Sequence, residues 1–304
     1  MKWYEDAALV RELPLRYQAY AFYSRIVGDP DSRRVPAGSF LLRAIRDASS
    51  ITGTSTVARI RGIDGLTVVA DFADERILEV IHEIRGENPE YRVLKSLLSA
   101  GGKFIDVGAN FGTFSLLASR MVGATGRVIA IEPQARLVAM IRESASLSGV
   151  NNCEVMQLAL GNEQKTLDLI VPSDDSGRAG FYQGFSGRHK HNTERANVVT
   201  LDSLDLGSVS LIKIDVEGSE LAVIAGASGT IDRLHPPILI ELNPWSARAA
   251  NTSTDSIVEQ LVNLGYNQFG LADSYPVTVD AAGIPRDRQI NLIAQQVAKQ
   301  QSTR

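Results

Sequence analysis

The spacing of apolar residues predicts both helices and strands in this chain, and the order in which they follow one another changes near residue 101. Beyond it, short apolar runs typical of strands alternate with segments whose apolar residues recur at helical spacing. The predicted strands are residues 104–107, 127–131, 153–160, 211–215, 238–242, 266–270 and 289–294, and the predicted helices are 111–122, 134–147, 219–227 and 256–264. Repeated βα units predict an α/β fold in which a mostly parallel sheet carries helices on both faces.

The first hundred residues follow a different order. Helices are expected at about 5–25 and 39–48, then two β-rich runs at 57–61 and 66–71 flank a Gly/Asp turn and predict a hairpin. Two more helices are expected near 75–85 and 88–99, and Gly101-Gly102 ends the second. We therefore divide the chain into an N-terminal helical and hairpin extension (1–100), a main domain (101–298) and a short flexible tail (299–304). The extension is expected to act as a substrate cover or an oligomer contact.

One stretch of the main domain departs from the βα pattern. Residues 166–171 and 197–199 have the character of extra strands, and residues 172–196 between them are rich in glycine and lack apolar periodicity. A connection of this length in a compact domain is usually functional or disordered. We interpret it as an insertion that could close over a pocket as a lid.

Composition narrows the class of protein. With 44% hydrophobic and 22% charged residues, the 304-residue chain can fold around a core of its own. A single cysteine, Cys153, excludes an intrachain disulfide and is consistent with a reducing cytoplasm, where we expect the protein to act. The N-terminus lacks the pattern of a signal peptide, and no apolar stretch reaches the ~20 residues that cross a membrane. The net charge of −4 gives no support to a nucleic-acid partner.

The loop Asp106-Val107-Gly108-Ala109-Asn110-Phe111-Gly112 leads from a predicted strand into a helix. Its glycines allow the backbone to approach a ligand closely, and the helix start supplies unpaired N–H groups. The carboxylate of Asp106 would repel the pyrophosphate of a dinucleotide, whose loop reads G-x-G-x-x-G. The loop therefore favours a cationic cofactor without phosphate, such as S-adenosylmethionine (SAM), over a nicotinamide cofactor.

Acidic residues also follow the next two strands of the predicted site. Glu132 comes at the end of the second strand, where a carboxylate can accept both ribose hydroxyls of a nucleoside. Asp215 and Glu217 lie where a later strand meets a short helix, and they could accept a proton, hold the substrate or ligate a divalent metal. The alternative is that these acids only stabilise the start of the helix, which is the role we assign to Glu220.

Taken together, these segments resemble the FkbM family of class I methyltransferases. The matching stretches are FIDVGANFGTFS (104–115), VIAIEP (128–133), VTLDSL (199–204), LIKIDVEGSELAVIAG (211–226) and LIELNP (239–244), in the order of the family. The resemblance implies a Rossmann-like sheet of seven strands with a reversed last strand. It also implies SAM as methyl donor and a hydroxyl acceptor on a small molecule such as a polyketide, a sugar or another natural product.

The family's roles carry over residue by residue. The resemblance implies that the methionine and ribose end of SAM is lined by Asp106, Gly108, Asn110 and Gly112, the ribose is held by Glu132, adenine meets the backbone of Ala159 and Leu160, and Asp215 faces the methyl group. At Asn243, where relatives often carry histidine, this chain has no base. Candidate bases are therefore Asp215, Glu217, and the two histidines of the insertion, His189 and His191.

Several alternatives stay open at this stage. His189 and His191 could be ordinary surface residues, and as a metal pair they lack a third ligand. Asn243-Pro244-Trp245 has a faint similarity to the motif of amino methylation, so an N-methyltransferase that acts on a macromolecule is one rival. A non-catalytic SAM-binding module is another. A divalent metal is compatible with the acids but is not predicted, and neither the acceptor nor the oligomeric state follows from the residues.

Overall fold

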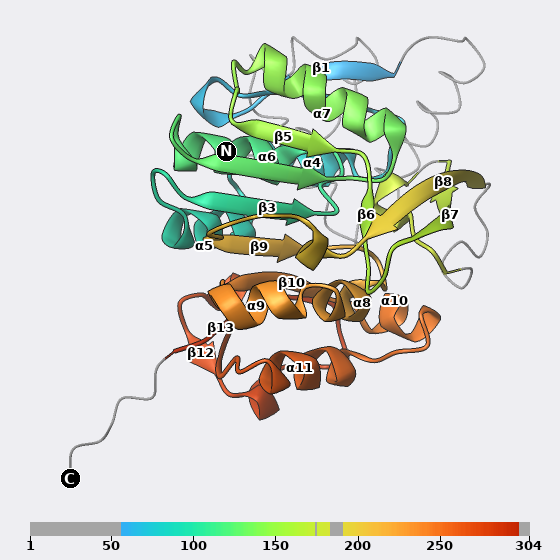
Figure 1. The fold of residues 1–304 in the computed structure, drawn as a ribbon. Coiled ribbons are helices and arrows are strands. Elements are labelled where there is room, and N and C mark those ends of the chain that lie inside the picture. The colour runs from blue at the N-terminus through green and yellow to red at the C-terminus, as the bar shows by residue number, and fades with distance from the viewer. Residues whose placement is uncertain (1–55, 174, 183–190, 298–304) are drawn as a thin grey trace, which may run out of the picture.

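A computed structural model describes residues 56–173, 175–182 and 191–297 of the chain. The expected helices at 5–25 and 39–48 and the tail at 299–304 lie outside the described residues. A central sheet lies between two layers of helices (Figure 1), so the expected α/β class is confirmed. Among the described residues, no helix combines the length and the apolar character needed to span a membrane.

The central sheet has the strand order β12-β11-β13-β10-β9-β3-β4-β5. Its parallel part consists of β3 (Lys103–Val107), β4 (Arg127–Ile131), β5 (Cys153–Met156), β9 (Leu211–Ile214) and β10 (Ile238–Leu242). Strand β13 (Ile290–Gln295) lies between β10 and β11 (Gln268–Leu271) and runs antiparallel to both, which confirms the reversed last strand. A short strand that was not predicted, β12 (Thr278–Val279), extends the expected seven-stranded sheet beside β11.

Helices cover both faces of this sheet. They are α4 (Ile77–Ile84), α5 (Pro89–Leu97), α6 (Thr113–Val122), α7 (Ala135–Leu147), α8 (Glu220–Ala225), α9 (Ser228–Leu234), α10 (Pro244–Ala249) and α11 (Thr254–Asn263). Successive side chains of a strand point to opposite faces. Ile105 and Ile212 therefore pack with α8, α9 and α11, whereas Phe104 and Leu211 pack with α5 and α6. Helices α9 and α10 were missed in the sequence because each is too short to develop a clear periodicity.

The hairpin predicted in the extension is confirmed. β1 (Val57–Arg61) pairs with β2 (Thr67–Asp71) around a 3-10 turn at Ile63–Gly65, and helices α4 and α5 follow at the predicted places. The apolar residues of β2 and α4 pack with those of α6 and α7 in one cluster. The backbone N–H of Val69 also donates to Ser144 Oγ on α7 at 2.8 Å. The described part of the extension therefore shares a core with the main domain.

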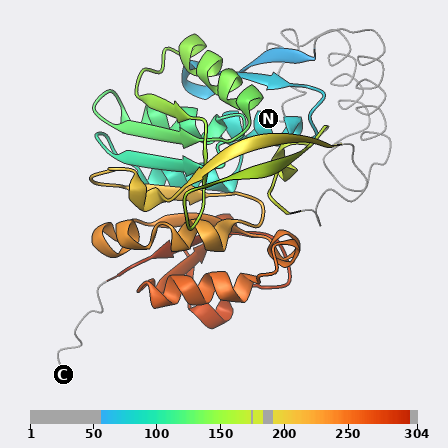
Figure 2. The same ribbon diagram turned by 45° about the vertical axis from the view of Figure 1, so that its right-hand side comes forward.

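The insertion is partly ordered into a second sheet. Strand β7 (Lys165–Pro172) pairs with β8 (His191–Val199) along its whole length, and β6 (Ala159–Leu160) lies on the other side of β8. This small sheet lies at the carboxyl ends of the main strands (Figures 1 and 2). The expectation of an irregular segment over 172–196 is wrong for residues 191–196, which belong to β8. Most of the first half of β8 is exposed, so no apolar alternation marks it in the sequence.

A second correction concerns residues 153–160, which were predicted as one strand. β5 ends at Met156, its pairing partner being Ile131, while Ala159 and Leu160 pair with β8 in the other sheet. The chain changes sheets at the point where Leu158 and Ala159 line a pocket. A continuous strand would have kept these residues within the main sheet, so the break serves to open the site.

Ser144→Ala tests whether the contact between strand β2 of the hairpin and helix α7 stabilises the fold. Ser144 is fully buried, accepts from Val69 N–H and donates to the carbonyl of Met140, so its loss leaves a buried N–H without a partner. We expect the free energy of unfolding in urea to fall by roughly 1–3 kcal/mol. Ser146→Ala, at an exposed position of the same helix, is the control and should stay within about 0.5 kcal/mol of wild type. Equal losses in both variants would contradict a stabilising role of this contact.

Candidate functional site

A pocket with a volume of about 600 Å³, its open mouth included, lies at the carboxyl ends of β3, β4 and β9. Ligands in open parallel sheets bind at this edge. Four of its lining segments were singled out from the sequence: the glycine loop with Gly108 and Asn110, Glu132, the pair Ala159 and Leu160, and the turn with Asp215 and Glu217.

The glycine loop is shaped by close approach of backbones. Gly108 has φ +80°, and a Cβ atom at this position would lie 1.9 Å from the carbonyl oxygen of Asp215. Only glycine therefore lets the loop after β3 pass the turn after β9. Gly112, also at positive φ, does not line the pocket, since a Cβ there would meet Ile141 of α7 at 2.9 Å. Its role in this structure is to let α6 begin against α7.

Asp106 occupies a different place from the one expected of a ligand-contacting residue. Strand alternation puts its side chain on the face covered by α6, where it is fully buried and accepts a 2.6 Å hydrogen bond from Ser115. Its other oxygen has no hydrogen-bond partner among the described residues, and burial raises its pKa. Asp106 is not part of the pocket lining, so its charge would act on a ligand from beneath the pocket.

Glu132 lies where the sequence placed it, at the pocket's edge after β4. Its two oxygens accept hydrogen bonds from the backbone N–H groups of Asn110 (2.9 Å) and Gln134 (3.0 Å), which fix the plane of the carboxylate. The side chain is 3% exposed, and burial raises its pKa to about 7. Each oxygen keeps a further lone pair with which it can accept a hydroxyl of a bound ligand.

The opposite wall carries the two acids of the turn after β9. Asp215 is paired with Lys213 at 2.9 Å, and although burial opposes its ionisation, the charges of Lys213 and Arg76 hold its pKa below the usual range. Glu217 adopts a left-handed backbone (φ 49°), which turns it into the pocket together with Asp215. Burial, helped by Glu241 and Asp215, raises the pKa of Glu217 to about 10. Both acids therefore face the pocket, and their charge states differ.

Glu220 stabilises the start of helix α8, as the sequence predicted. Its carboxylate accepts hydrogen bonds from the backbone N–H groups of Gly218 (3.1 Å) and Val216 (3.4 Å), so it holds the turn at the start of α8. Asn243 likewise has a local role, since its side-chain oxygen accepts from the N–H groups of Trp245 (3.1 Å) and Ser246 (3.4 Å). This N-cap of α10 accounts for the Asn-Pro pair without reference to amino methylation.

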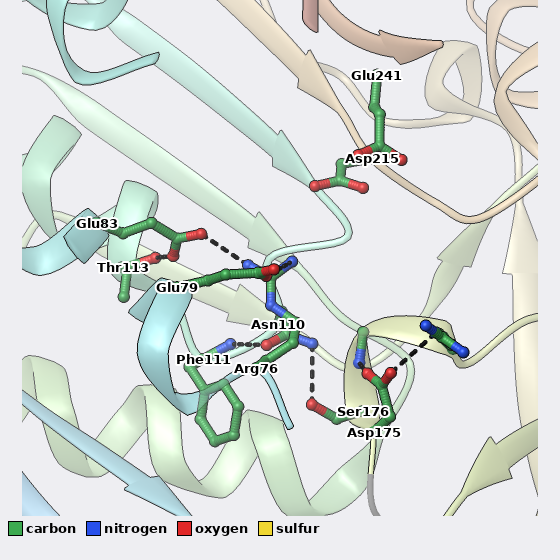
Figure 3. Close-up of polar contacts among 12 residues, drawn as sticks. Arg76, Glu79, Glu83, Asn110, Phe111, Thr113, Asp175, Ser176, Asp215 and Glu241 are labelled. Carbon is green, nitrogen blue, oxygen red and sulfur yellow. Dashed lines mark hydrogen bonds and ion pairs between the residues drawn. The ribbon is translucent and has the colours of Figure 1, made fainter. Parts of the chain in front are cut away.

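The extension contributes a residue that the sequence did not mark. Arg76, just before α4, lines the pocket and pairs with Glu83 at 2.7 Å and Glu79 at 3.4 Å (Figure 3). Although burial opposes its charge, these two acids raise the pKa of Arg76 further above its usual value. Glu83 also accepts a hydrogen bond from Thr113 at the start of α6. No motif surrounds Arg76, and only the packing of α4 against α6 brings it here.

The start of the insertion closes the pocket from the same side. Ser176 is buried, and its N–H donates to the carboxylate of Asp74 in the extension at 3.2 Å. Its hydroxyl accepts from the Asn110 side chain at 3.2 Å (Figure 3), and its carbonyl accepts from the Gln134 side chain at 3.1 Å. Ser176 thus joins the extension, the insertion and the glycine loop. No sequence motif indicated the hydrogen bond between Ser176 and Asp74.

The two histidines are not brought into the pocket by the described structure. His189 lies outside the described residues. His191 is the exposed first residue of β8, opposite Pro172, and does not line the pocket. Their role as bases stays a prediction. An acid that sequence reasoning passed over is Glu241 of β10, and its signal was a charge inside the otherwise apolar run Ile-Leu-Ile-Glu-Leu.

Comparison with known proteins identifies a family. The Methyltransferase FkbM domain model matches residues 106–267, which is more than half of the chain. Over 94 residues, 30% of this chain and 47% of the other, the sequence is 33% identical to a probable cobalt-precorrin-6B C(15)-methyltransferase (decarboxylating) of Sulfolobus acidocaldarius. The chain therefore spans about half the length of this curated relative.

Solved structures give weaker similarities. A methyltransferase FkbM from Methylobacillus flagellatus matches at 18% identity over 75% of this chain and 56% of that one, with a TM-score of 0.42. A SAM-dependent O-methyltransferase from Thermotoga maritima matches at 12% identity over 83% of this chain and 82% of that one, also with a TM-score of 0.42.

The close approach at Gly108 makes a matched pair of glycine substitutions informative. Gly123→Ala changes a residue at φ +66° and ψ −173° with open space around it, so it should cost only the backbone penalty, roughly 1–3 kcal/mol. Gly108→Ala adds a clash with the Asp215 carbonyl and should cost at least about 2 kcal/mol more. Urea unfolding measures both. A Gly108→Ala variant as stable as Gly123→Ala would show that the two backbones do not meet as described.

Proposed function

The chain belongs to the FkbM methyltransferase family, and from this premise we propose that it transfers the methyl group of SAM to a hydroxyl oxygen of a small molecule. The observation that carries the proposal is the pocket itself. It has a carboxylate able to hold a ribose, Glu132, on one wall and two acids, Asp215 and Glu217, on the opposite wall. A natural product such as a polyketide or a sugar is the acceptor class we favour, and a cytoplasmic location is part of the proposal.

The cofactor would lie along the carboxyl edge of the sheet. Glu132 would accept the ribose hydroxyls, and the adenine would lie by Ala159 and Leu160, which also line the pocket. The positive sulfonium would then point towards Asp215 and Glu217 on the other wall. The ionised carboxylate of Asp215 favours a cationic donor, and burial strengthens this attraction because the local dielectric is low.

The reaction is a direct displacement. An acceptor oxygen attacks the methyl carbon, the carbon–sulfur bond breaks with its electron pair staying on sulfur, and S-adenosylhomocysteine leaves as a neutral thioether. The acceptor's proton passes to the carboxylate of Asp215, the ionised acid on this wall of the pocket. Holding the two reactants in line supplies roughly 7–11 kcal/mol of the barrier. Arg76 would close the pocket and keep water from the methyl group.

Transfer of tritium from methyl-labelled SAM tests the proposed function. Panels of phenols, sugars and polyketide alcohols are compared with amines, RNA and protein as acceptors. We expect label in an O-methyl ether of a small molecule. Label confined to nitrogen or to a macromolecule would contradict the acceptor class, and the absence of SAM binding at millimolar concentration would contradict the activity.

Asp215→Asn tests the proposed catalytic wall. If the carboxylate takes part in the transfer, kcat should fall by roughly 100-fold or more, while calorimetry still detects SAM binding. Asp205→Asn changes an exposed acid in the connection between β8 and β9. It is the matched control and should leave kcat unchanged. An Asp215→Asn variant with the kcat of wild type would remove this residue from the reaction.

The raised pKa of Glu132 predicts a pH-dependent affinity for SAM. Below a pKa of about 7 the carboxyl of the empty pocket is neutral, so it must lose its proton to accept both ribose hydroxyls. The Kd should therefore rise by up to about tenfold per pH unit below 7 and level off above pH 8. Glu132→Gln should bind SAM more weakly at pH 8, and its Kd should no longer rise in this way as the pH falls below 7. Equal slopes in the two proteins, measured by calorimetry in the same buffers, would exclude Glu132 as the ribose acceptor.

A further inference from the structure

Three carboxylates converge beside the pocket, and two of them line it. Asp215 and Glu217 come from the turn after β9, and Glu241 comes from the neighbouring strand β10. One oxygen of each lies within 4.8 Å of an oxygen of the other two. Asp215 and Glu241 face one another from their separate elements (Figure 3).

Glu241 is the member that cannot turn away to water. Its side chain belongs to a buried strand, is 8% exposed, and has one oxygen held by the side-chain amide of Gln289 at 2.5 Å. The other oxygen is buried and has no hydrogen-bond partner among the described residues. One oxygen of Glu217 is in the same state. A buried carboxylate oxygen without a donor is costly, so two of them beside one another indicate a missing positive charge.

The two cations near the cluster form their ion pairs with acids other than Glu217 and Glu241. Lys213 pairs with Asp215, and Arg76 is taken up by Glu79 and Glu83. In the described part of the chain, no ion pair within 4.0 Å reaches Glu217 or Glu241. Once Asp215 is matched with Lys213, Glu217 and Glu241 are left, and when both are ionised their combined charge equals that of one divalent cation.

We propose that Asp215, Glu217 and Glu241 bind one divalent cation of the hard, oxygen-preferring class, such as Mg²⁺, Mn²⁺ or Ca²⁺. Three atoms this close share a point no farther than about 2.8 Å from each, so a small inward movement gives the Ca²⁺–oxygen distance of about 2.3–2.6 Å. The ligand set is all carboxylate, which selects these cations over zinc or copper.

The position of the ion gives it a role that rests on the proposed function. Asp215 and Glu217 line the pocket, so the open coordination positions of the ion face the space where an acceptor would lie. A hydroxyl oxygen bound there would have its pKa lowered by the cation. The ion would also select an acceptor with a second oxygen next to the reacting hydroxyl, because two neighbouring oxygens can chelate it.

Titration of the metal-stripped protein with Mn²⁺ tests the site without any methyl acceptor. The loss of the electron paramagnetic resonance signal of hydrated Mn²⁺ reports binding, and Mg²⁺ or Ca²⁺ should compete. Glu241→Gln retains the shape of the side chain and should weaken Mn²⁺ binding at least tenfold. Glu154→Gln, an exposed acid on β5, is the matched control and should bind as wild type does. Mn²⁺ should also raise the Tm of wild type and not that of Glu241→Gln.

If wild type binds no Mn²⁺ at 1 mM, or if Glu241→Gln binds as tightly as wild type, the cation site does not exist. Should Glu241→Gln fail to fold, the half-buried Glu217 replaces it as Glu217→Gln, with the same expected loss. SAM binding is measured separately by calorimetry. Mn²⁺ binding without SAM binding would refute the proposed function and leave the cation site in place, whereas SAM binding without Mn²⁺ binding would do the reverse.

Discussion

The constraint that shapes this molecule is the burial of carboxylates at one edge of a parallel sheet. Parallel strands end at the same edge, so the acids that follow or end β3, β4, β9 and β10 gather there. Lys213 forms an ion pair with Asp215, and backbone N–H groups donate hydrogen bonds to Glu132. Glu217 and Glu241 each keep one buried oxygen without a hydrogen-bond donor among the described residues. The pocket is therefore built to receive positive charge. A sulfonium cofactor and a divalent cation are two forms in which that charge can arrive.

The N-terminal extension contributes residues to the pocket at this edge of the sheet. The matched family domain begins at residue 106, yet Arg76 lines the pocket and Asp74 holds the N–H of Ser176. Both residues come from the short connection between the hairpin and α4. Because this connection is anchored on the shared core of β2, α4, α6 and α7, its position is coupled to that of the glycine loop. The acceptor would meet surfaces of both parts of the chain.

The parts of the site that follow strands were predictable, because strand ends in a βα fold have fixed neighbours. Gly108, Asn110, Glu132, Asp215 and Glu217 all line the pocket as expected. Asp106 was expected in the pocket lining, but the alternation of strand side chains puts it on the face covered by α6, where it bonds to Ser115.

Residues that reach the site through packing of distant segments left no local pattern. Arg76 and Ser176 are of this kind, and the exposed strand β8 had no apolar alternation to reveal it. The most direct test of the whole account is a crystal structure of the protein with S-adenosylhomocysteine. We expect the ribose hydroxyls on the Glu132 carboxylate and the sulfur directed at the Asp215–Glu217 turn. A ribose bound away from Glu132, or a sulfur directed away from that turn, would contradict it.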